Sequence, residues 1–262
     1  MFIDTHCHLD APEFDHDRDA VVARARDAGV ATLVVPAITL DTLPQTLAMR
    51  QRYGCPVALG LHPIYERSHR EEHLPALRAM IEQESPVAVG EIGLDFFVAG
   101  LDAQRQTELF AAQLKMARDF DLPVLLHVRK SQDQVLKQLR RFGVRRGIAH
   151  AFNGSPQQAQ AYLDQGMKLG FGGNLTFERA LNIRRLAMDL PLEAIVLETD
   201  APDISPEWAY QQRNEPAYLP RIAHLLAELR GTDLTTIMQA TSRNAEAVLG
   251  PLPAAQPAKA AA

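Results

Sequence analysis

Eight short runs of apolar and β-branched residues alternate along the chain with longer segments that have the periodicity of amphipathic helices. The runs lie at residues 1–6, 31–37, 57–62, 87–93, 123–128, 146–152, 167–173 and 194–200. Eight strand–helix units in about 250 residues are typical of a (β/α)8 barrel. We therefore predict an α/β fold, a TIM barrel, in a single domain over residues 1–250. A doubly wound open sheet is the alternative, but it usually has fewer strands and often a glycine-rich turn after the first one.

Composition limits the cell compartment and the kinds of partner. The formal net charge is −5, which argues against a protein that coats nucleic acid non-specifically. Cys7 and Cys55 are the only cysteines and have no CxxC spacing, so no disulfide framework is indicated. No leader pattern or membrane span is apparent. We expect a cytoplasmic protein that binds no membrane and has no obligate protein partner. We also expect the Ala/Pro-rich tail at 251–262 to be disordered.

Six side chains suited to metal binding come at the carboxyl ends of five of the expected strands. They are His6, His8, Glu91, His127, His150 and Asp200. In a barrel of parallel strands these ends meet at one mouth, where enzymes with this fold build their sites. A lone HxH pair is more often structural or exposed than catalytic, but the joint pattern on five strands favours a metal site.

The HxH pair has a spacing that suits a shared ligand. His6 and His8 are two residues apart, so an extended strand places both rings on one side of the chain. Cys7 should point the other way, as a small buried apolar residue. Four imidazoles and two carboxylates are more than one tetrahedral zinc ion needs, and they suit two ions about 3.5–4 Å apart. Glu91 is the candidate bridge, and Asp200 can bind one ion and also accept a proton from water.

Seven motifs extend this pattern over most of the chain: DTHCHLD, ALGLHP, VAVGEIGLDF, LPVLLHVRKS, HAFNGS, KLGFGG and LETDAP, followed by RNEP. Together they resemble the TatD family of metal-dependent hydrolases within the amidohydrolase-like superfamily. The resemblance implies a TIM barrel with two metal ions and deoxyribonuclease activity, often at the 3′ end of DNA. Two segments depart from the best-studied nucleases: HAFNGS in place of HCFSGS, and FVAGLDAQRQ after GLDF.

The resemblance also implies a division of the metal ligands. One ion would be held by His6, His8 and Asp200, and the other by His127 and His150, with Glu91 between them. The ions would be divalent zinc, manganese, magnesium or iron.

We predict from these residues a metal-dependent hydrolase, a deoxyribonuclease of the 3′–5′ exonuclease type that uses a water activated by two metals. Asp200 and Glu91 are the predicted catalytic residues, and DNA, single-stranded or at its 3′ ends, is the predicted substrate. One alternative is an enzyme of the same kind that acts on an amide, cyclic amide or ester. Another is a barrel that binds metal or a partner without turnover.

Four residues are candidates for substrate binding. His62, in GLHP, could orient a substrate phosphate or support a metal ligand. Arg129 could contact phosphate or form a salt bridge at the barrel rim. Phe152 could present an aromatic face to a terminal base, and Arg213 lies in a loop region that often holds phosphate in barrels. The remaining histidines are expected to be solvated: His16, His69, His73 and His224.

Overall fold

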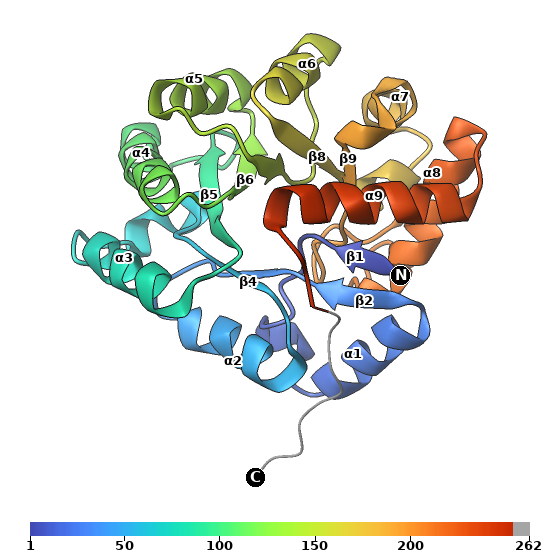
Figure 1. The fold of residues 1–262 in the computed structure, drawn as a ribbon, viewed down its shortest axis with the longest axis horizontal. Coiled ribbons are helices and arrows are strands. Elements are labelled where there is room, and N and C mark those ends of the chain that lie inside the picture. The colour runs from blue at the N-terminus through green and yellow to red at the C-terminus, as the bar shows by residue number, and fades with distance from the viewer. Residues whose placement is uncertain (254–262) are drawn as a thin grey trace.

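A ring of parallel strands enclosed by helices forms the centre of the molecule, in a computed structural model that describes residues 1–253 (Figure 1). The strands are β1 (Phe2–Asp4), β2 (Val30–Leu33), β3 (Val35–Pro36), β4 (Val57–Leu59), β5 (Ala88–Asp95), β6 (Val124–Arg129), β7 (Gly147–Ala149), β8 (Met167–Phe171) and β9 (Ile195–Leu197). The α-helices are α1 (Arg18–Asp27), α2 (Leu43–Tyr53), α3 (His73–Glu84), α4 (Ala103–Asp119), α5 (Gln132–Phe142), α6 (Pro156–Asp164), α7 (Leu181–Asp189), α8 (Leu219–Arg230) and α9 (Leu234–Leu249). Short 3₁₀ helices lie between them: η1 (Pro12–Phe14), η2 (Pro63–Ser68), η3 (Gly173–Thr176), η4 (Leu192–Ala194), η5 (Glu207–Ala209) and η6 (Pro216–Tyr218).

The strands pair in parallel and in the order of the sequence. β3 to β9 form one sheet in chain order, and β1 pairs with β2. The second expected strand is divided into β2 and β3, which are separated only by Val34. The ring closes between β1 and β9, because the N–H of Thr5 donates to the carbonyl of Leu197 at 3.1 Å. The eight expected runs thus form a (β/α)8, TIM-barrel-like fold, which confirms the fold prediction.

Local sequence signals fix the ends of the outer helices. Ser155 and Gln158 form a capping box at the start of α6: the Ser155 hydroxyl accepts from the Gln158 N–H at 3.1 Å, and the Gln158 side chain accepts from the Ser155 N–H at 2.9 Å. Gly143 ends α5 with a left-handed φ of 69°, a conformation that glycine adopts without steric cost. None of the described helices is both long and apolar enough to cross a membrane.

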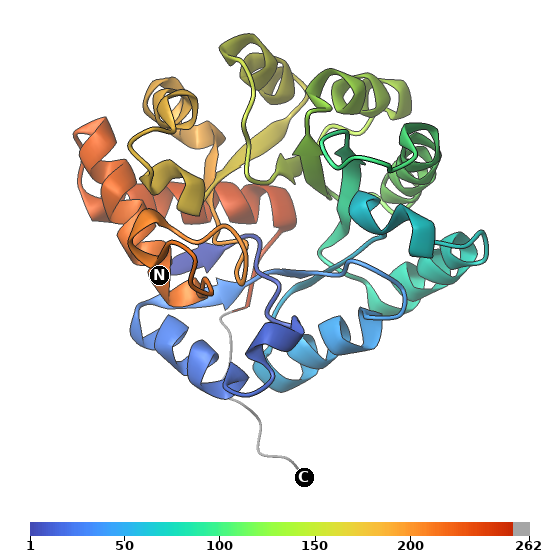
Figure 2. The same cartoon turned by 180° about the vertical axis from the view of Figure 1, so that it is seen from behind.

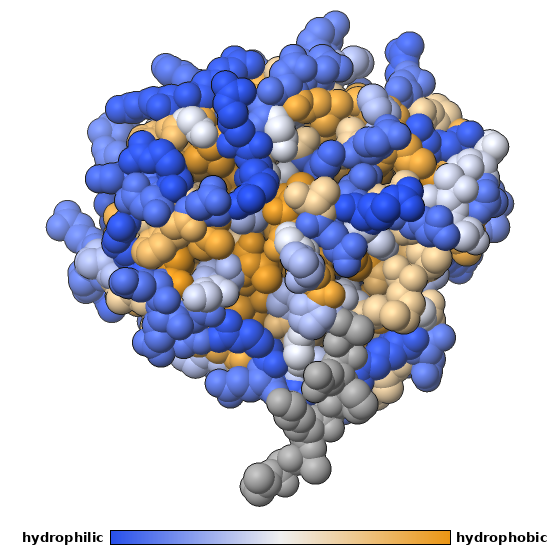
Figure 3. Space-filling view, viewed as in Figure 1, coloured by the Kyte–Doolittle hydropathy of each residue, from blue (hydrophilic) through white to orange (hydrophobic). Residues whose placement is uncertain are grey.

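Helix α9 closes the amino-terminal end of the barrel (Figure 1). Its residues Ala245, Val248 and Leu249 share one apolar cluster with a ring of strand residues: Ile3, Val34, Ala58, Ala88, Leu125, Ile148 and Val196. On this face of the molecule, hydrophilic residues cover much of the surface and apolar patches lie between them (Figure 3). The opposite end of the ring faces the viewer in Figure 2 and carries the loops that follow the strands. Packing therefore fills one end of the barrel and leaves the other for a site.

The predicted disordered tail lies mostly outside the described residues, which end at Pro253. Of the three tail residues that are described, Leu252 packs against the cluster beneath α9, and the carbonyl of Pro253 accepts a hydrogen bond from Thr32 at 3.0 Å. Within the described residues, the chain therefore keeps contact with the barrel at Leu252 and Pro253.

Candidate metal centre

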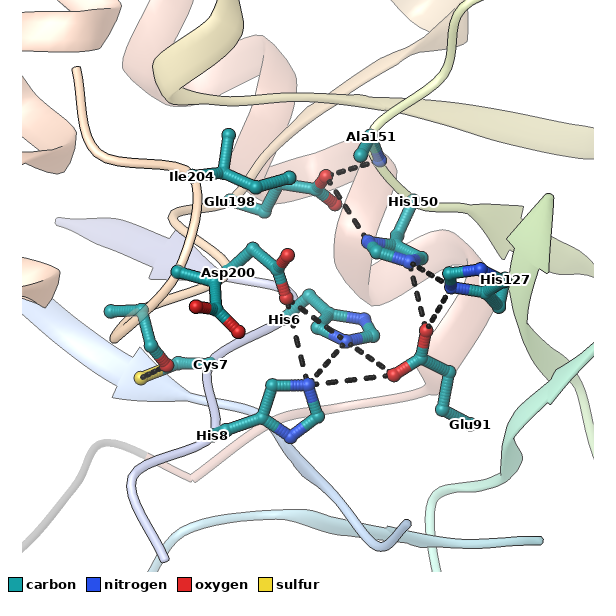
Figure 4. Close-up of polar contacts among 12 residues, drawn as sticks. His6, Cys7, His8, Glu91, His127, His150, Ala151, Glu198, Asp200 and Ile204 are labelled. Atoms are coloured by element: carbon teal, nitrogen blue, oxygen red, sulfur yellow. Dashed lines mark hydrogen bonds and ion pairs between the residues drawn. The ribbon is translucent and has the colours of Figure 1, made fainter. Parts of the chain in front are cut away.

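The six side chains suited to metal binding converge at the carboxyl end of the barrel, around Glu91 (Figure 4). The Glu91 carboxylate comes from β5 and is buried. Its Oε2 lies 3.0 Å from His6 Nε2 and 3.5 Å from His8 Nε2. Its Oε1 lies 3.0 Å from His127 Nδ1 and 2.8 Å from His150 Nε2. Oε2 therefore faces the two imidazoles of the HxH pair, and Oε1 faces His127 and His150 together with His62, whose Nε2 lies 3.1 Å away.

The first pair of imidazoles comes from the segment that follows β1. His6 Nε2 and His8 Nε2 lie 3.3 Å apart, so both rings point to the same place, as the spacing predicts. The side chain of Cys7 points away from them and is fully buried (Figure 4). Its Sγ lies 3.7 Å from the carbonyl of Ala201, which confirms that it is a packing residue rather than part of the cluster.

Asp200, which follows β9, completes this half of the site. Its Oδ1 lies 3.6 Å from Nε2 of both His6 and His8. Its backbone has a left-handed φ of 58°, which aspartate tolerates better than most residues, and its N–H donates to the carbonyl of His6 at 2.8 Å. The ligand atoms of the three residues lie within 4.8 Å of one another, which is compact enough for one metal ion. We call His6, His8 and Asp200 the first half of the site.

His127 and His150 form the second half of the site. His127 lies in β6 and His150 directly follows β7, and their facing nitrogens are 3.4 Å apart. A buried carboxylate stands behind each ring: Asp95 Oδ2 is 2.9 Å from His127 Nε2, and Glu198 Oε1 is 3.8 Å from His150 Nδ1. Of the outer ring nitrogens, His127 Nε2 is hydrogen-bonded, whereas His150 Nδ1 and His6 Nδ1 have no hydrogen-bond partner among residues 1–253.

Electrostatics make the cluster a good match for a divalent cation. Burial opposes the charge on Glu91, but His62, His150 and His6 outweigh it and hold the pKa of Glu91 well below its usual range. Burial and the neighbouring His150 lower the pKa of His6 to about 3, so its ring is neutral at pH 7 and has a lone pair to donate. Several buried imidazoles thus surround one charged carboxylate. A metal ion binds imidazoles through the nitrogen that has lost its proton, so this set of side chains fits a divalent cation.

The cluster opens into a cavity of about 1290 Å³ whose wall includes His62 and Arg129. His62 Nε2 lies 3.1 Å from Glu91 Oε1. The guanidinium of Arg129 lies 3.9 Å from the centre of the Phe97 ring, and one of its nitrogens lies 3.9 Å from Asp95 Oδ2. Arg129 therefore combines the two interpretations that the sequence leaves open, since it lines the cavity and also approaches a carboxylate.

Two substrate-binding predictions are corrected by the structure. Phe152 is only 2% exposed, and its ring packs edge-on against Tyr162 at 5.3 Å between centroids, so it has no free face for a base. Arg213 is bound on both nitrogens by the carboxylate of Asp17, at 2.7 Å each, and it is not among the residues that line the cavity. Phe152 is a core residue and Arg213 ties two loops together.

Two of the histidines expected to be solvated are also buried. His69 and His73 are only 3% and 2% exposed. His69 Nε2 lies 2.9 Å from the carbonyl of His62 and so supports the loop that carries His62. His16 and His224 are exposed, as expected.

Asp95 and Glu198 are the residues that sequence reasoning missed. Both lie in motifs that the sequence analysis quotes, GLDF and LETD. The strand pattern, however, does not identify either position as a metal ligand. β5 continues to Asp95, so Glu91 lies within the strand rather than at its end. The residue pairs that these carboxylates make are 32 and 48 positions apart in the sequence, so only the folded barrel brings them together.

The fold and the cluster together define a class of protein. A (β/α)8 barrel with histidines and carboxylates gathered at the carboxyl ends of its strands is the architecture of a metal-dependent hydrolase. The family model described as "TatD related DNase" matches residues 3–250. The chain belongs to the TatD family of metal-dependent hydrolases.

Individual relatives agree with this assignment. The chain is 40% identical over 247 residues to the "Uncharacterized metal-dependent hydrolase YjjV" of Escherichia coli K12, covering 93% of this chain and 95% of the relative. The crystal structure of that TatD homologue superposes with a TM-score of 0.92 at 39% identity, over 95% of this chain and 98% of the other. The chain is also 34% identical over 251 residues to the "3′-5′ ssDNA/RNA exonuclease TatD" of Cronobacter sakazakii, covering 92% and 95%.

Proposed function

We propose that this protein is a 3′–5′ exonuclease that hydrolyses phosphodiester bonds of single-stranded nucleic acid, with two divalent metal ions as cofactors. The observation that carries the proposal is the division of Glu91: Oε2 faces His6 and His8, and Oε1 faces His127 and His150, with the N–H of His62 as a further contact. One carboxylate between two sets of nitrogen ligands is the arrangement of a two-metal site. The nuclease relatives support nucleic acid as the substrate.

The ligands divide between the two ions along the halves of the site. His6, His8 and Asp200 would hold one ion, His127 and His150 the other, and Glu91 would bridge them. When bound, such a pair of ions polarises the phosphoryl group and activates water at neutral pH. Of the ligands, Asp200 is the candidate proton acceptor, because it lines the cavity and because burial raises its pKa toward the range in which a general base works well.

His62 is suited to contact a substrate phosphate. Its Nδ1 accepts a hydrogen bond from the N–H of Ile64 at 3.1 Å, so the proton of the neutral ring is on Nε2. Burial lowers the pKa of His62 to about 4, so the ring is neutral at pH 7. Nε2 points at Glu91 as a donor, and a donor cannot be a metal ligand. If the two ions take the oxygens of Glu91, this N–H would be released to donate to a phosphate oxygen, beside the cations Arg129 and Lys130 in the cavity wall.

A second groove continues from the cavity and favours a strand over a small amide substrate. Its volume is about 680 Å³, and it shares Asn153, Asn174 and Ile204 with the cavity. It also contains Phe177 and Tyr210, whose ring centroids lie 6.0 Å apart. Exposed aromatic rings are what single-stranded nucleic acids stack on.

Comparing a long and a small substrate tests whether the groove binds the nucleic-acid strand. Tyr210→Ala should slow degradation of a long single strand and leave hydrolysis of bis-p-nitrophenyl phosphate unchanged, because that small diester does not reach the groove. Met188→Ala, which also removes an exposed apolar side chain but lies outside the groove, is the matched control. An equal loss on both substrates would contradict this path.

The central experiment uses a 5′-labelled single-stranded oligonucleotide with added Mn²⁺ or Mg²⁺. The wild type should produce a ladder that shortens from the 3′ end and disappears with chelator. Asp200→Asn and His127→Ala should each slow the reaction roughly 100-fold or more. Asp121→Asn and His224→Ala, at exposed positions, are the matched controls and should behave as the wild type.

The other outcomes separate the alternatives. Wild-type rates in Asp200→Asn would show that the assigned base is wrong. Turnover of an ester or a cyclic amide without DNA cleavage would favour an amidohydrolase-type enzyme, and metal binding with no turnover would favour a non-catalytic barrel.

We also infer a cytoplasmic location, because both cysteines are buried and free.

A further inference from the structure

We propose that Asp95 and Glu198 are positioning residues that turn opposite ring nitrogens of His127 and His150 towards the metal site. His127 would bind through Nδ1 and His150 through Nε2. The inference rests on the two-metal site proposed above and concerns only its second half. It assigns a function to two buried carboxylates that the proposed reaction does not otherwise use.

Asp95 is fixed on every side and holds His127. It is buried, and its Oδ2 lies 2.9 Å from His127 Nε2. Its Oδ1 accepts hydrogen bonds from the N–H groups of Phe97 and Val98, at 2.8 and 2.9 Å. The side chain of Gln106 binds both the N–H and the carbonyl of Asp95, at 2.7 and 3.0 Å. The carboxylate therefore cannot rotate away, and it accepts the His127 Nε2 proton.

Glu198 stands in the same relation to the other ring of the second half (Figure 4). It is buried, and its Oε1 accepts from the N–H of Ala151 at 2.5 Å. The same oxygen lies 3.8 Å from His150 Nδ1. Glu198 Oε2 and His150 Nδ1 are both buried, and neither has a hydrogen-bond partner in the described chain. The oxygen nearer to His150 is Oε1, and a small movement of either side chain would bring Nδ1 within hydrogen-bond distance of it. Burial of an Nδ1 that has no partner favours that movement.

The neighbouring strand is shaped to admit this carboxylate. A Cβ on Gly170 would lie 2.1 Å from Glu198 Oε2, and a Cβ on Gly172 would lie 2.7 Å from the Glu198 carbonyl. Neither glycine has a positive φ, so the reason for glycine here is space rather than backbone conformation. The first two glycines of the KLGFGG motif thus leave the space in which Glu198 sits, whereas the third, Gly173, lies against the Ile204 carbonyl.

The two carboxylates set which nitrogen of each ring is free. A proton on His127 Nε2, held by Asp95, leaves the Nδ1 lone pair facing Glu91, and a proton on His150 Nδ1, held by Glu198, leaves Nε2 facing Glu91. A carboxylate behind a metal-binding imidazole fixes its tautomer and raises its basicity, and loss of such a partner typically weakens metal binding 10–100-fold.

The test that bears directly on this claim is ¹⁵N NMR of the histidine rings in the zinc-loaded protein. The proposal predicts that the His127 ring carries its proton on Nε2 and the His150 ring on Nδ1. Zinc affinity, measured by competition with a chromogenic chelator, should fall about 10–100-fold in Asp95→Asn and in Glu198→Gln. Glu66→Gln, at a buried carboxylate outside the cluster that accepts from the N–H of Asp102, is the matched control.

Each outcome decides the proposal. The same tautomer in both rings would overturn it, and that result needs no variant to fold. Unchanged zinc affinity in Glu198→Gln, with the thermal stability of the metal-free protein also unchanged, would reduce Glu198 to a packing residue. A wild type that shows the two tautomers but degrades no nucleic acid would leave the inference standing and remove only the proposed substrate.

Discussion

The two halves of the candidate metal centre use the same kinds of side chain in different ways. In the first half, His6 and His8 come from one short segment, and Asp200 joins them from β9. In the second half, His127 and His150 come from two strands, and Asp95 and Glu198 stand behind them. Local chain geometry therefore places the two imidazoles of the first half, whereas Asp200 and both imidazoles of the second half are brought together by the fold.

This difference predicts unequal binding. In the second half Asp95 holds the His127 ring before metal arrives, and Glu198 lies 3.8 Å from His150 Nδ1, so less ordering remains to be done on binding. In the first half no hydrogen bond holds His6 Nδ1 within residues 1–253, and the His8 side chain is 16% exposed. We expect the second half to bind metal more tightly.

The largest effect should come from the residue that the halves share. Glu91→Gln removes the charge that faces the four imidazoles assigned as metal ligands, so both ions should be lost and activity should fall about a thousandfold, which corresponds to several kcal/mol of lost transition-state stabilisation. Metal content by mass spectrometry and nuclease assays check this result. Retention of two ions with wild-type affinity would mean that Glu91 is not the bridge.

Substitutions confined to one half should separate the two ions. His6→Ala should weaken one ion by more than the 10–100-fold that is typical of losing an outer partner, and His127→Ala should do the same to the other. Each variant should still bind one ion per chain in a cobalt titration followed by absorbance. Loss of both ions from either variant would show that the halves do not bind independently.

Gly170→Ala should affect only the second half. The added Cβ would lie 2.1 Å from Glu198 Oε2 and would push the carboxylate away from His150. The expected result is a loss of metal affinity of about 10–100-fold in the second half, of the same size as in Glu198→Gln. The first half of the same protein is the internal control, and an equal loss in both halves would indicate a general disturbance of the barrel.

The smallest effect concerns pH and should appear in both halves. Burial opposes the charge on His8 and His150, but Glu91 outweighs it and raises the pKa of His8 to about 9 and that of His150 to about 10 in the metal-free protein. Both rings then carry an extra proton at pH 7 that a metal must displace, so affinity should rise with pH up to about pH 9 in the first half and about pH 10 in the second, and binding should release protons. Calorimetry in buffers with different protonation enthalpies measures this release, and an affinity that is independent of pH would contradict it.

The sequence predicts the features that depend on local chain geometry, and it misses those that depend on contacts between distant residues. The eight strands were identified because β-branched runs and helical periods are local signals, and the positions of His6, His8 and Cys7 follow from the alternation of an extended segment. The sequence could not show that Glu198 faces His150, because that contact depends on the space beside Gly170. Phe152 was misjudged for a related reason, since an aromatic residue after a strand packs inward as readily as it lines a site.

The central prediction for this protein is that each half of the site binds one metal ion and that the two halves differ in affinity. A calorimetric zinc titration of the wild type, Asp200→Asn and Glu198→Gln tests this in one experiment. We predict two ions per wild-type chain with distinct affinities, the weaker reduced in Asp200→Asn and the tighter reduced in Glu198→Gln. A single ion in the wild type, or a loss of the same affinity in both variants, would contradict the account.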